Sequence, residues 1–380
     1  MRIGLDARVL QSGPITGVQE YTRFLYKSLL RIESTHELVL YFNTSHGVDE
    51  KIYQNLGANN VVTRTTPSKL IGLMSVFGIG QTIDGFCEKK GYKLDAFFSP
   101  NINFTRVSSS VPFFLTIHDL SFIHYPEYFN GWRRIWHRLV RPAELARQAQ
   151  VILPPSHSTA RDLKATFRVD EEKIRTLSPA VDPNFGDFIN QDLSVREKMV
   201  KEVKKKFHLP EKYFIFVGAI EPRKNLLGIL EAYSLVRKEN PHCPGLIIVG
   251  PHGWKCEDIL RQMTLTQGVK YIGYVAAGDR PALYAGAVAL VYPSYYEGFG
   301  FPIIEAGVVG TPVVASARAA LVEFDWEGIV YVNPRNVYDI ARGMVEVGNI
   351  QPTPLSNVRQ WDDVAREFIS ILEKKYENRH

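Results

Sequence analysis

The sequence predicts an α/β protein of two domains, each built on a doubly wound parallel sheet. Three observations support this fold class. A chain of 380 residues is longer than one ordinary hydrophobic core requires. Short apolar runs alternate with helical stretches along the chain. Residues 287–311 have the pattern of a buried strand, a glycine loop and a helix, which is the repeating unit of such sheets.

The first half of the chain carries this alternation up to about residue 182. Strands are expected at Arg2–Val9, Leu38–Phe42, Asn60–Arg64, Leu94–Phe98, Pro112–His118 and Ile174–Leu177. A loop that contains Thr16 and Gly17 follows the first strand and leads into an amphipathic helix. Residues 183–210 are polar and rich in lysine, and we interpret them as a connection that includes a surface helix.

The second half repeats the architecture. Strands are expected at Tyr213–Gly218, Gly245–Val249, Val269–Ile272, Ala287–Tyr292, Pro312–Ala315 and Gly328–Val332. Helices are expected at Leu226–Arg237, Val337–Val347 and Trp361–Tyr376. The sequence therefore predicts an N-terminal domain at residues 1–182, the connection at 183–210 and a C-terminal domain at 211–360.

The composition, with 45% hydrophobic and 22% charged residues, is typical of a soluble globular protein. No apolar run reaches the length of about 18 residues that a membrane-spanning helix needs. Asp6 and Arg8 interrupt any export-signal core at the N-terminus. The three cysteines form no C-x-x-C pair and are expected to be reduced thiols. These features predict a cytoplasmic protein.

The net charge of +5 is concentrated in the first half. Residues 1–182 hold 22 Lys and Arg against 17 Asp and Glu, whereas residues 183–380 hold 23 of each. This excess indicates an anionic partner of the N-terminal domain, although an ordinary scatter of charges would produce it too.

Within residues 293–311, two carboxylates, Glu297 and Glu305, bracket the glycine loop. Phosphates bind at such a loop, against the free N–H groups of a helix N-terminus. Carboxylates repel phosphate, so we interpret the two glutamates as groups that bind hydroxyls. A ligand with phosphates and many hydroxyls is a nucleotide sugar. Alternatively, the pair acts as acid and base in glycoside hydrolysis, or Glu305 stabilises the helix dipole.

Arg223 and Lys224 follow the first strand of the second half, in the turn before a helix. Two cations are unfavourable at the positive end of a helix unless an anion binds among them. Arginine grips phosphate oxygens in a fork and lysine adds a point charge. A solvated basic turn is the alternative interpretation.

His118 is expected at the end of the strand Pro112–His118, where a histidine can donate a hydrogen bond to a sugar hydroxyl. A purely structural histidine is the alternative. His118, Asp119 and His124 lack a further ligand cluster, and no D-x-D motif occurs, so no metal site is predicted.

Two stretches, residues 70–83 and 132–141, are candidates for membrane contact. The first is free of charge over fourteen residues, and the second is a basic amphipathic segment with two tryptophans. Ordinary core helices are the alternative for each. No recognition motif supports nucleic-acid binding.

Residues 297–305, Glu-Gly-Phe-Gly-Phe-Pro-Ile-Ile-Glu, resemble the E-x7-E signature of the retaining glycosyltransferases of family 4. Further resemblances are residues 217–225 to the phosphate-binding turn of that family, residues 16–19 to its N-terminal glycine loop and His118-Asp119 to its strand-end histidine. Residues 361–365 resemble its last helix. The resemblance implies the GT-B fold, which has two Rossmann-like domains that face a cleft and a C-terminal helix at 361–376 that packs back on the first.

The resemblance also implies roles for these residues in binding the donor. Arg223 and Lys224 would stabilise the departing nucleoside diphosphate, and this chain has Ala219-Ile220 where many relatives carry another arginine. Glu305 would hold the nucleotide ribose. Glu297 would hold the hydroxyls of the donor sugar.

The backbone of the loop and two residues of the N-terminal domain complete the implied site. Gly298, Phe299 and Gly300 would assist Glu297 through their backbone. Gly17 would offer its N–H to a phosphate, and His118 would face the donor sugar.

The expected activity is therefore retaining, metal-independent transfer of a sugar from a nucleoside-diphosphate sugar, with GDP-mannose favoured. The acceptor is a saccharide, with a lipid-linked one as a hypothesis, and the enzyme would work at the inner face of the cell membrane. A nucleotide-sugar epimerase of the same fold and an inactive nucleotide-sugar-binding subunit are the alternatives.

Overall fold

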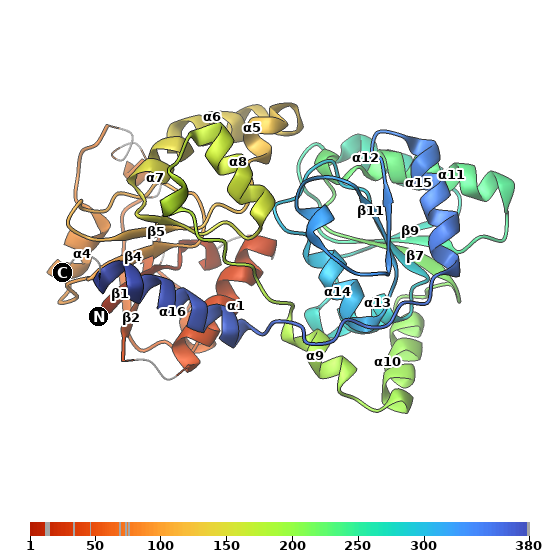
Figure 1. Cartoon of the computed structure of the whole chain (residues 1–380), viewed down its shortest axis with the longest axis horizontal. Coiled ribbons are helices and arrows are strands. Elements are labelled where there is room, and N and C mark those ends of the chain that lie inside the picture. The colour runs from red at the N-terminus through yellow and green to blue at the C-terminus, as the bar shows by residue number, and fades with distance from the viewer. Residues whose placement is uncertain are drawn as a thin grey trace. The chain divides into compact units, whose positions relative to one another are not determined.

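The structure is a computed structural model that describes residues 1–11, 16–32, 35–45, 47–67, 70–72, 74 and 77–377 (Figure 1). The chain forms two compact units. The first contains Met1–Leu120, Gly131–Ala180 and the residues from Arg359 onwards, and the second contains Ser121–Asn130 and Val181–Val358. Each unit is therefore built from separate stretches of the chain.

The first unit has a six-stranded sheet in the order β3-β2-β1-β4-β5-β6. All its strand pairs are parallel. The strands are β1 Arg2–Asp6, β2 Glu37–Asn43, β3 Val61–Arg64, β4 Ala96–Ser99, β5 Phe113–Leu115 and β6 Val151–Ile152. The strands are buried and strongly apolar, as expected for a parallel sheet that is covered on both faces.

Three expectations for these strands were wrong at their ends. Val9 lies in a 3₁₀ helix, η1 (Arg8–Gln11), instead of the first strand. β5 stops at Leu115, which pairs with Ser99, the last residue of its neighbour β4. Ile174–Leu177 is not a strand, since Ile174 makes only an isolated bridge to Ile152 in β6, a strand that the sequence reading missed.

Helices of the first unit pack around this sheet. They are α1 Gly17–Arg31, α2 Glu50–Gln54, α4 Ile83–Lys89, α6 Gly131–Val140, α7 Pro142–Gln148, α8 His157–Phe167 and α16 Trp361–Glu377. The C-terminal helix α16 lies beside α1 (Figure 1), with the ring of Trp361 against those of Tyr21 and Phe24. Phe368, further along α16, is fully buried against Phe98 of β4. The end of the chain thus completes the core of the first unit.

The second unit has a six-stranded parallel sheet in the order β12-β11-β10-β7-β8-β9. The strands are β7 Tyr213–Val217, β8 Gly245–Val249, β9 Val269–Gly273, β10 Ala289–Tyr292, β11 Val313–Ser316 and β12 Ile329–Val332. All six were expected, with ends that differ by at most two residues. Both sheets therefore place the first strand of the unit beside its fourth, the order of a doubly wound sheet with a switch point between those two strands.

The helices of the second unit cover a continuous apolar core that includes the central strands. They are α5 Ser121–His124, α9 Pro183–Ile189, α10 Leu193–Lys206, α11 Leu226–Glu239, α12 Glu257–Leu265, α13 Arg280–Ala285, α14 Phe301–Val309 and α15 Val337–Glu346. The segment interpreted as a connection thus forms two helices, α9 and α10. Val203 of α10 belongs to the core.

Candidate active site

The loops after β7 and β10 meet at the switch point of the second sheet. The loop after β7 ends in a short 3₁₀ helix, η4 (Pro222–Lys224), and the loop after β10 carries Glu297. Lys224 Nζ donates to Glu297 Oε1 at 2.7 Å, and Arg223 Nη1 donates to Glu297 Oε2 at 2.8 Å. In doubly wound sheets ligands bind at this position. The fold therefore brings together three of the residues that the sequence singled out.

The two cations are held by further bonds inside the unit. Arg223 Nη2 donates to Glu221 Oε1 at 2.7 Å, and its Nη1 also donates to the carbonyl of Tyr296 at 2.6 Å. Lys224 is only 8% exposed. The interpretation of Arg223 and Lys224 as a solvated basic turn is thus wrong. Glu221 and Glu297 balance the two positive charges, so the cluster as a whole is neutral.

The charges of this cluster shift the pKa values of its members. Burial alone would raise the pKa of Glu297, but the positive charges of Arg223 and Lys224 overcome it and lower that pKa from 4.5 to about 2. Burial lowers the pKa of Lys224, and the attraction of Glu297 opposes this shift. Glu297 is therefore an ionised carboxylate at neutral pH, which suits binding and argues against a role as general acid.

Two residues that the sequence reading missed support the cluster. Tyr292, the last residue of β10, accepts from Lys224 Nζ at 2.7 Å and donates to Glu297 Oε1 at 3.0 Å. Asn225 has a left-handed backbone with φ 59°, and its Nδ2 donates to the carbonyls of Pro293 and Pro334. The sequence signals that could have found them are the hydroxyl-bearing Tyr292 at the end of an apolar strand and Asn225 directly after Arg223 and Lys224.

The glycine loop closes with Gly300, which caps α14 with φ 113°. A Cβ on Gly300 would lie 2.6 Å from Leu321 Cδ2, so only glycine fits this backbone without displacement. Gly298 is buried, and the ring of Phe299 packs edge-on against those of Phe301 and Phe324. The loop backbone therefore has a fixed path next to Glu297.

Glu305 lies in the second turn of α14 and is 3% exposed. Tyr284 Oη donates to its Oε2 at 2.6 Å, and Arg280 Nη1 lies 3.6 Å from its Oε1. Because α14 has no acidic residue in its first turn, the interpretation of Glu305 as a dipole-stabilising residue is wrong. Sequence reading missed Tyr284 and Arg280, which hold this carboxylate from α13.

Gly17 and His118 belong to the first unit and are described within it. Gly17 is the first residue of α1, and Thr16 caps that helix by accepting from Gln19 N in a capping box. The ring of His118 packs edge-on against Tyr21 of α1, with ring centroids 4.9 Å apart. The first turns of α1 therefore contact the chain after β5. This contact is expected, because both segments follow the carboxyl ends of parallel strands, which lie at the same edge of the sheet.

His118 lies three residues beyond the end of β5, not at the strand end that the sequence reading assigned to it. Its Nε2 lies 2.8 Å from the carbonyl of Pro100. Because a carbonyl can only accept a hydrogen bond, Nε2 carries the proton and donates, and Nδ1 is the acceptor of the neutral ring. Burial lowers the pKa of His118, against the pull of this hydrogen bond and of Asp119. His118 is therefore a neutral imidazole at pH 7.

Two kinds of feature are absent from the described residues. In that part of the chain, no group of three or more His, Cys, Asp or Glu side chains is arranged to hold a metal ion. None of the helices seen there combines the length and the apolarity that crossing a bilayer requires. All three cysteines are buried free thiols.

Two family models match the chain over most of its length. The model for glycosyl transferases group 1 matches residues 198–354, and the model for glycosyltransferase family 4 matches residues 16–185.

Two curated relatives are mannosyltransferases by name. The O-antigen chain mannosyltransferase B of Escherichia coli is 29% identical over 347 residues, which are 88% of this chain and 87% of that protein. The O-antigen chain mannosyltransferase RfbU of Salmonella typhimurium is 30% identical over 229 residues, which are 58% of this chain and 56% of that protein.

Among solved structures, sucrose-phosphate synthase from Thermosynechococcus elongatus has a TM-score of 0.73 at 15% identity, and the match covers 99% of each chain. At this identity the likeness concerns the fold, which is GT-B. The two sheets agree with the two family models, which together match most of the chain, and with the Escherichia coli relative, whose match spans 88% of it. The chain is a glycosyltransferase that belongs to glycosyltransferase family 4.

Proposed function

We propose that this glycosyltransferase moves a mannosyl residue from GDP-mannose to a saccharide acceptor in polysaccharide synthesis, with retention of the anomeric configuration and without a metal ion. The observation that carries the proposal is the buried cluster of Arg223, Lys224 and Glu297 at the switch point of the second sheet. The names of the two curated relatives support a mannosyl donor and a polysaccharide product.

The cluster is suited to a leaving diphosphate. A diphosphate would compete with Glu297 for Arg223 and Lys224, because it offers more negative charge to the same donors. When the diphosphate binds the two cations in its place, Glu297 is released, and its oxygens can accept hydrogen bonds from sugar hydroxyls. Preorganised cations that stabilise the charge developing on the diphosphate are the main catalytic effect, and they supply it without a metal ion.

Glu305, Gly17 and His118 have supporting roles in this proposal. Glu305 binds the nucleotide ribose, with Tyr284 fixing one of its oxygens. The N–H of Gly17, at the N-terminus of α1, suits a phosphate oxygen. The acceptor nitrogen of the neutral His118 ring suits a sugar hydroxyl.

Contact with the inner face of the cell membrane is part of the proposal. Trp132, Ile135 and Leu139 form an exposed apolar stripe on α6, and Trp132 is 82% exposed. Arginines occupy the neighbouring positions of the same helix. Phe77 and Ile79 are exposed in the other candidate segment, residues 70–83, in which Leu73, Ser75 and Val76 lie outside the described residues.

The test is a panel of nucleoside-diphosphate sugars scored by thermal stabilisation, since a bound ligand raises stability by mass action. GDP-mannose should stabilise the chain most, and Lys224→Ala should lower its turnover at least ~100-fold. Lys238→Ala removes an exposed lysine of the same unit and should change neither quantity. Unchanged turnover in Lys224→Ala with a verified donor would contradict the assignment.

Product analysis distinguishes the two alternatives. An epimerase would convert GDP-mannose into another nucleotide sugar in the absence of acceptor. A binding subunit would be stabilised by the donor without consuming it. Release of GDP that depends on an added saccharide acceptor supports the transferase.

A further inference from the structure

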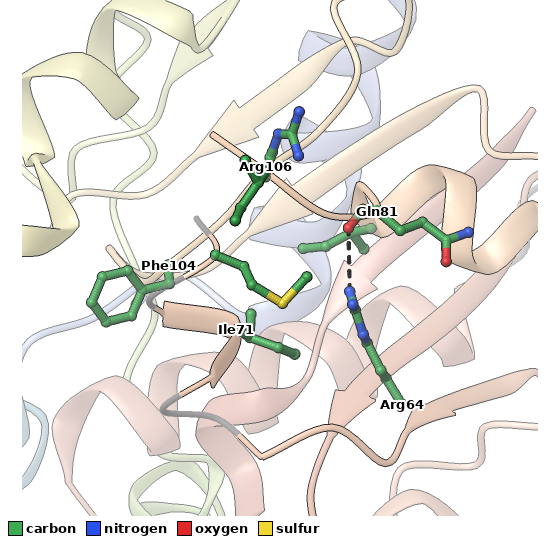
Figure 2. A pocket seen from close by; sticks show the side chains of 8 residues that line it. Arg64, Ile71, Gln81, Phe104 and Arg106 are labelled. Atoms are coloured by element: carbon green, nitrogen blue, oxygen red, sulfur yellow. Dashed lines mark hydrogen bonds between the residues drawn. The ribbon is translucent and has the colours of Figure 1, made fainter. Parts of the chain in front are cut away.

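A recess in the first unit is lined by none of the residues of the candidate active site (Figure 2). It is formed by the end of β3, the segment before α4 and residues 104–106. It is open to solvent, and its empty space of about 290 Å³ includes the solvent at its mouth. Its lining is apolar except for two arginines and a glutamine: Arg64, Ile71, Met74, Ile79, Gln81, Ile83, Phe104 and Arg106.

Arg64 is a buried cation in this lining, with 8% of its surface exposed. Its Nη1 donates to the carbonyl of Gln81 at 3.3 Å, as Figure 2 shows, and its guanidinium lies over the ring of Phe86 at 5.3 Å. These partners are neutral. Within the described residues Arg64 forms no ion pair with any carboxylate. Its charge therefore has no carboxylate counter-ion in the part of the chain that the structure describes.

Arg106 adds a second positive charge to the same recess. One of its nitrogens donates to the carbonyl of Gly80, again a neutral partner, and it too forms no ion pair among the residues described. No Asp or Glu is among the described residues that line the recess, and residues 68, 69, 73, 75 and 76, which lie outside the described part, include no acidic residue in the sequence.

Two unpaired cations in one small recess are unfavourable. Carbonyl oxygens satisfy the N–H groups, but they leave the charge of a buried guanidinium uncompensated, and two like charges repel each other. An anion in the recess removes both costs. The planar fork of arginine matches phosphate oxygens best, and the apolar lining favours a hydrocarbon chain beside the anion.

We propose that this recess binds a phosphate group carried by an apolar chain, with Arg64 and Arg106 on the phosphate and Ile71, Met74 and Ile79 against the chain. The phosphate belongs either to a lipid-linked acceptor or to an anionic membrane lipid. Only the first of these sources rests on the proposed function, because binding of the phosphate needs no sugar transfer.

The binding test uses the full chain and three probes: farnesyl phosphate below its micelle concentration, farnesol and inorganic phosphate. Farnesyl phosphate should bind more tightly than either of the others in calorimetric titrations. Arg64→Gln and Arg106→Gln should each weaken its binding about tenfold or more, the scale for losing a charge-assisted hydrogen bond. Equal binding of farnesol, or no effect of either substitution, would overturn the proposal.

Arg175→Gln is the matched control. Arg175 is an exposed arginine next to the β6 edge of the same sheet, opposite the β3 edge, and its side chain donates to the backbone carbonyl of Ile174. Arg175→Gln should leave the binding of farnesyl phosphate unchanged. If it weakened binding as much as Arg64→Gln does, only the net charge of the protein would matter. A loss of binding that comes from misfolding is identified by circular dichroism spectra and by Arg64→Lys, which keeps the positive charge. Arg106 is less buried than Arg64, so Arg106→Gln tests the phosphate site independently.

Two further measurements identify the source of the phosphate. If it is the acceptor, Arg106→Gln should raise the KM for a polyprenyl-diphosphate-linked saccharide and leave the KM for the donor unchanged. If it is a membrane lipid, the variant should lose sedimentation with phosphatidylglycerol vesicles. Either result supports the recess as a phosphate site. If Arg106→Gln changes neither the KM for the acceptor nor the sedimentation with vesicles, the proposal is contradicted. If the unaltered chain does not turn over the donor, the proposed function is contradicted, but the phosphate site is not.

Discussion

Glu297 joins two cations through one carboxylate, and this arrangement decides what the residue can do. Each of its oxygens accepts from a different side chain, Oε1 from Lys224 and Oε2 from Arg223. A carboxylate held in this way neither titrates near neutral pH nor rotates freely. Any ligand of the site must therefore exchange partners with Glu297 when it binds the cations.

The lowered pKa of Glu297 predicts a pH dependence of stability. A carboxyl with a folded-state pKa of about 2 and an ordinary value of 4.5 stabilises the fold fully above pH 4.5, and the contribution is lost as the pH falls from 4.5 towards 2. Glu297→Gln should lower the free energy of unfolding by about 3 kcal/mol at pH 7, and this difference should shrink at pH 3. Urea unfolding at both pH values measures it.

Glu231→Gln is the control for this experiment, because Glu231 is exposed on α11 and the substitution changes the formal charge equally. Its effect should be within about 0.5 kcal/mol at both pH values. A destabilisation by Glu297→Gln that stays constant from pH 7 to pH 3 would show that the ion pairs do not control this carboxyl.

The identity of the site residues could be predicted from the sequence, but their contacts could not. Arg223, Lys224 and Glu297 stand out because each follows an apolar strand. That Glu297 pairs with Lys224, 73 residues away, depends on how β7 and β10 lie side by side. The roles of Tyr292 and Asn225 were missed for the same reason, since a side chain's partners are set by the packing of distant segments.

At the scale of elements, the loop between β10 and α14 depends on one glycine. Gly300→Ala should lower the free energy of unfolding by about 1–3 kcal/mol, because it strains a left-handed backbone and pushes a Cβ against Leu321. Donor-induced thermal stabilisation should fall as well, since the loop carries Glu297. Chemical unfolding and the donor titration measure the two effects.

Gly278→Ala is the matched control in the same unit. Gly278 is exposed, and no atom lies within 4 Å of the position that its Cβ would take. It should unfold like the unaltered chain. If both glycine variants behaved alike, the backbone conformation of Gly300 would not be the reason for its presence.

Strand interiors were predicted well and strand ends poorly. The apolar runs of the second sheet are buried and continuous, so each gave a clear signal. β6 has only two residues, too few for a pattern, and β5 was expected to reach His118 but ends at Leu115. A strand ends where its hydrogen bonds to the neighbouring strand end, and the position of that neighbour cannot be predicted from the strand's own residues.

At the scale of the whole molecule, the first unit needs the C-terminal helix. Phe368 of α16 is fully buried against Phe98 and Phe114 of the first sheet. Phe368→Ala should lower the free energy of unfolding of the first unit by about 3–5 kcal/mol. Because the Lys224–Glu297 cluster is in the other unit, donor-induced stabilisation of that unit should remain. Differential scanning calorimetry with and without donor separates the two units.

Lys374→Ala, an exposed position on the same helix, is the control and should leave both transitions unchanged. If Phe368→Ala and Lys374→Ala gave the same calorimetric trace, α16 would not be part of the core of the first unit.

The sequence by itself determined the fold class, the repeated architecture and the residues that carry charge at the ligand end of the second sheet. These follow from local patterns, namely apolar runs, glycine loops and charged residues just after strands. Only the tertiary structure decided that Glu297 neutralises Arg223 and Lys224, and that Arg64 is buried with no carboxylate partner among the described residues. The physical reason is that the energy of a charge depends on its burial and on its neighbours in space.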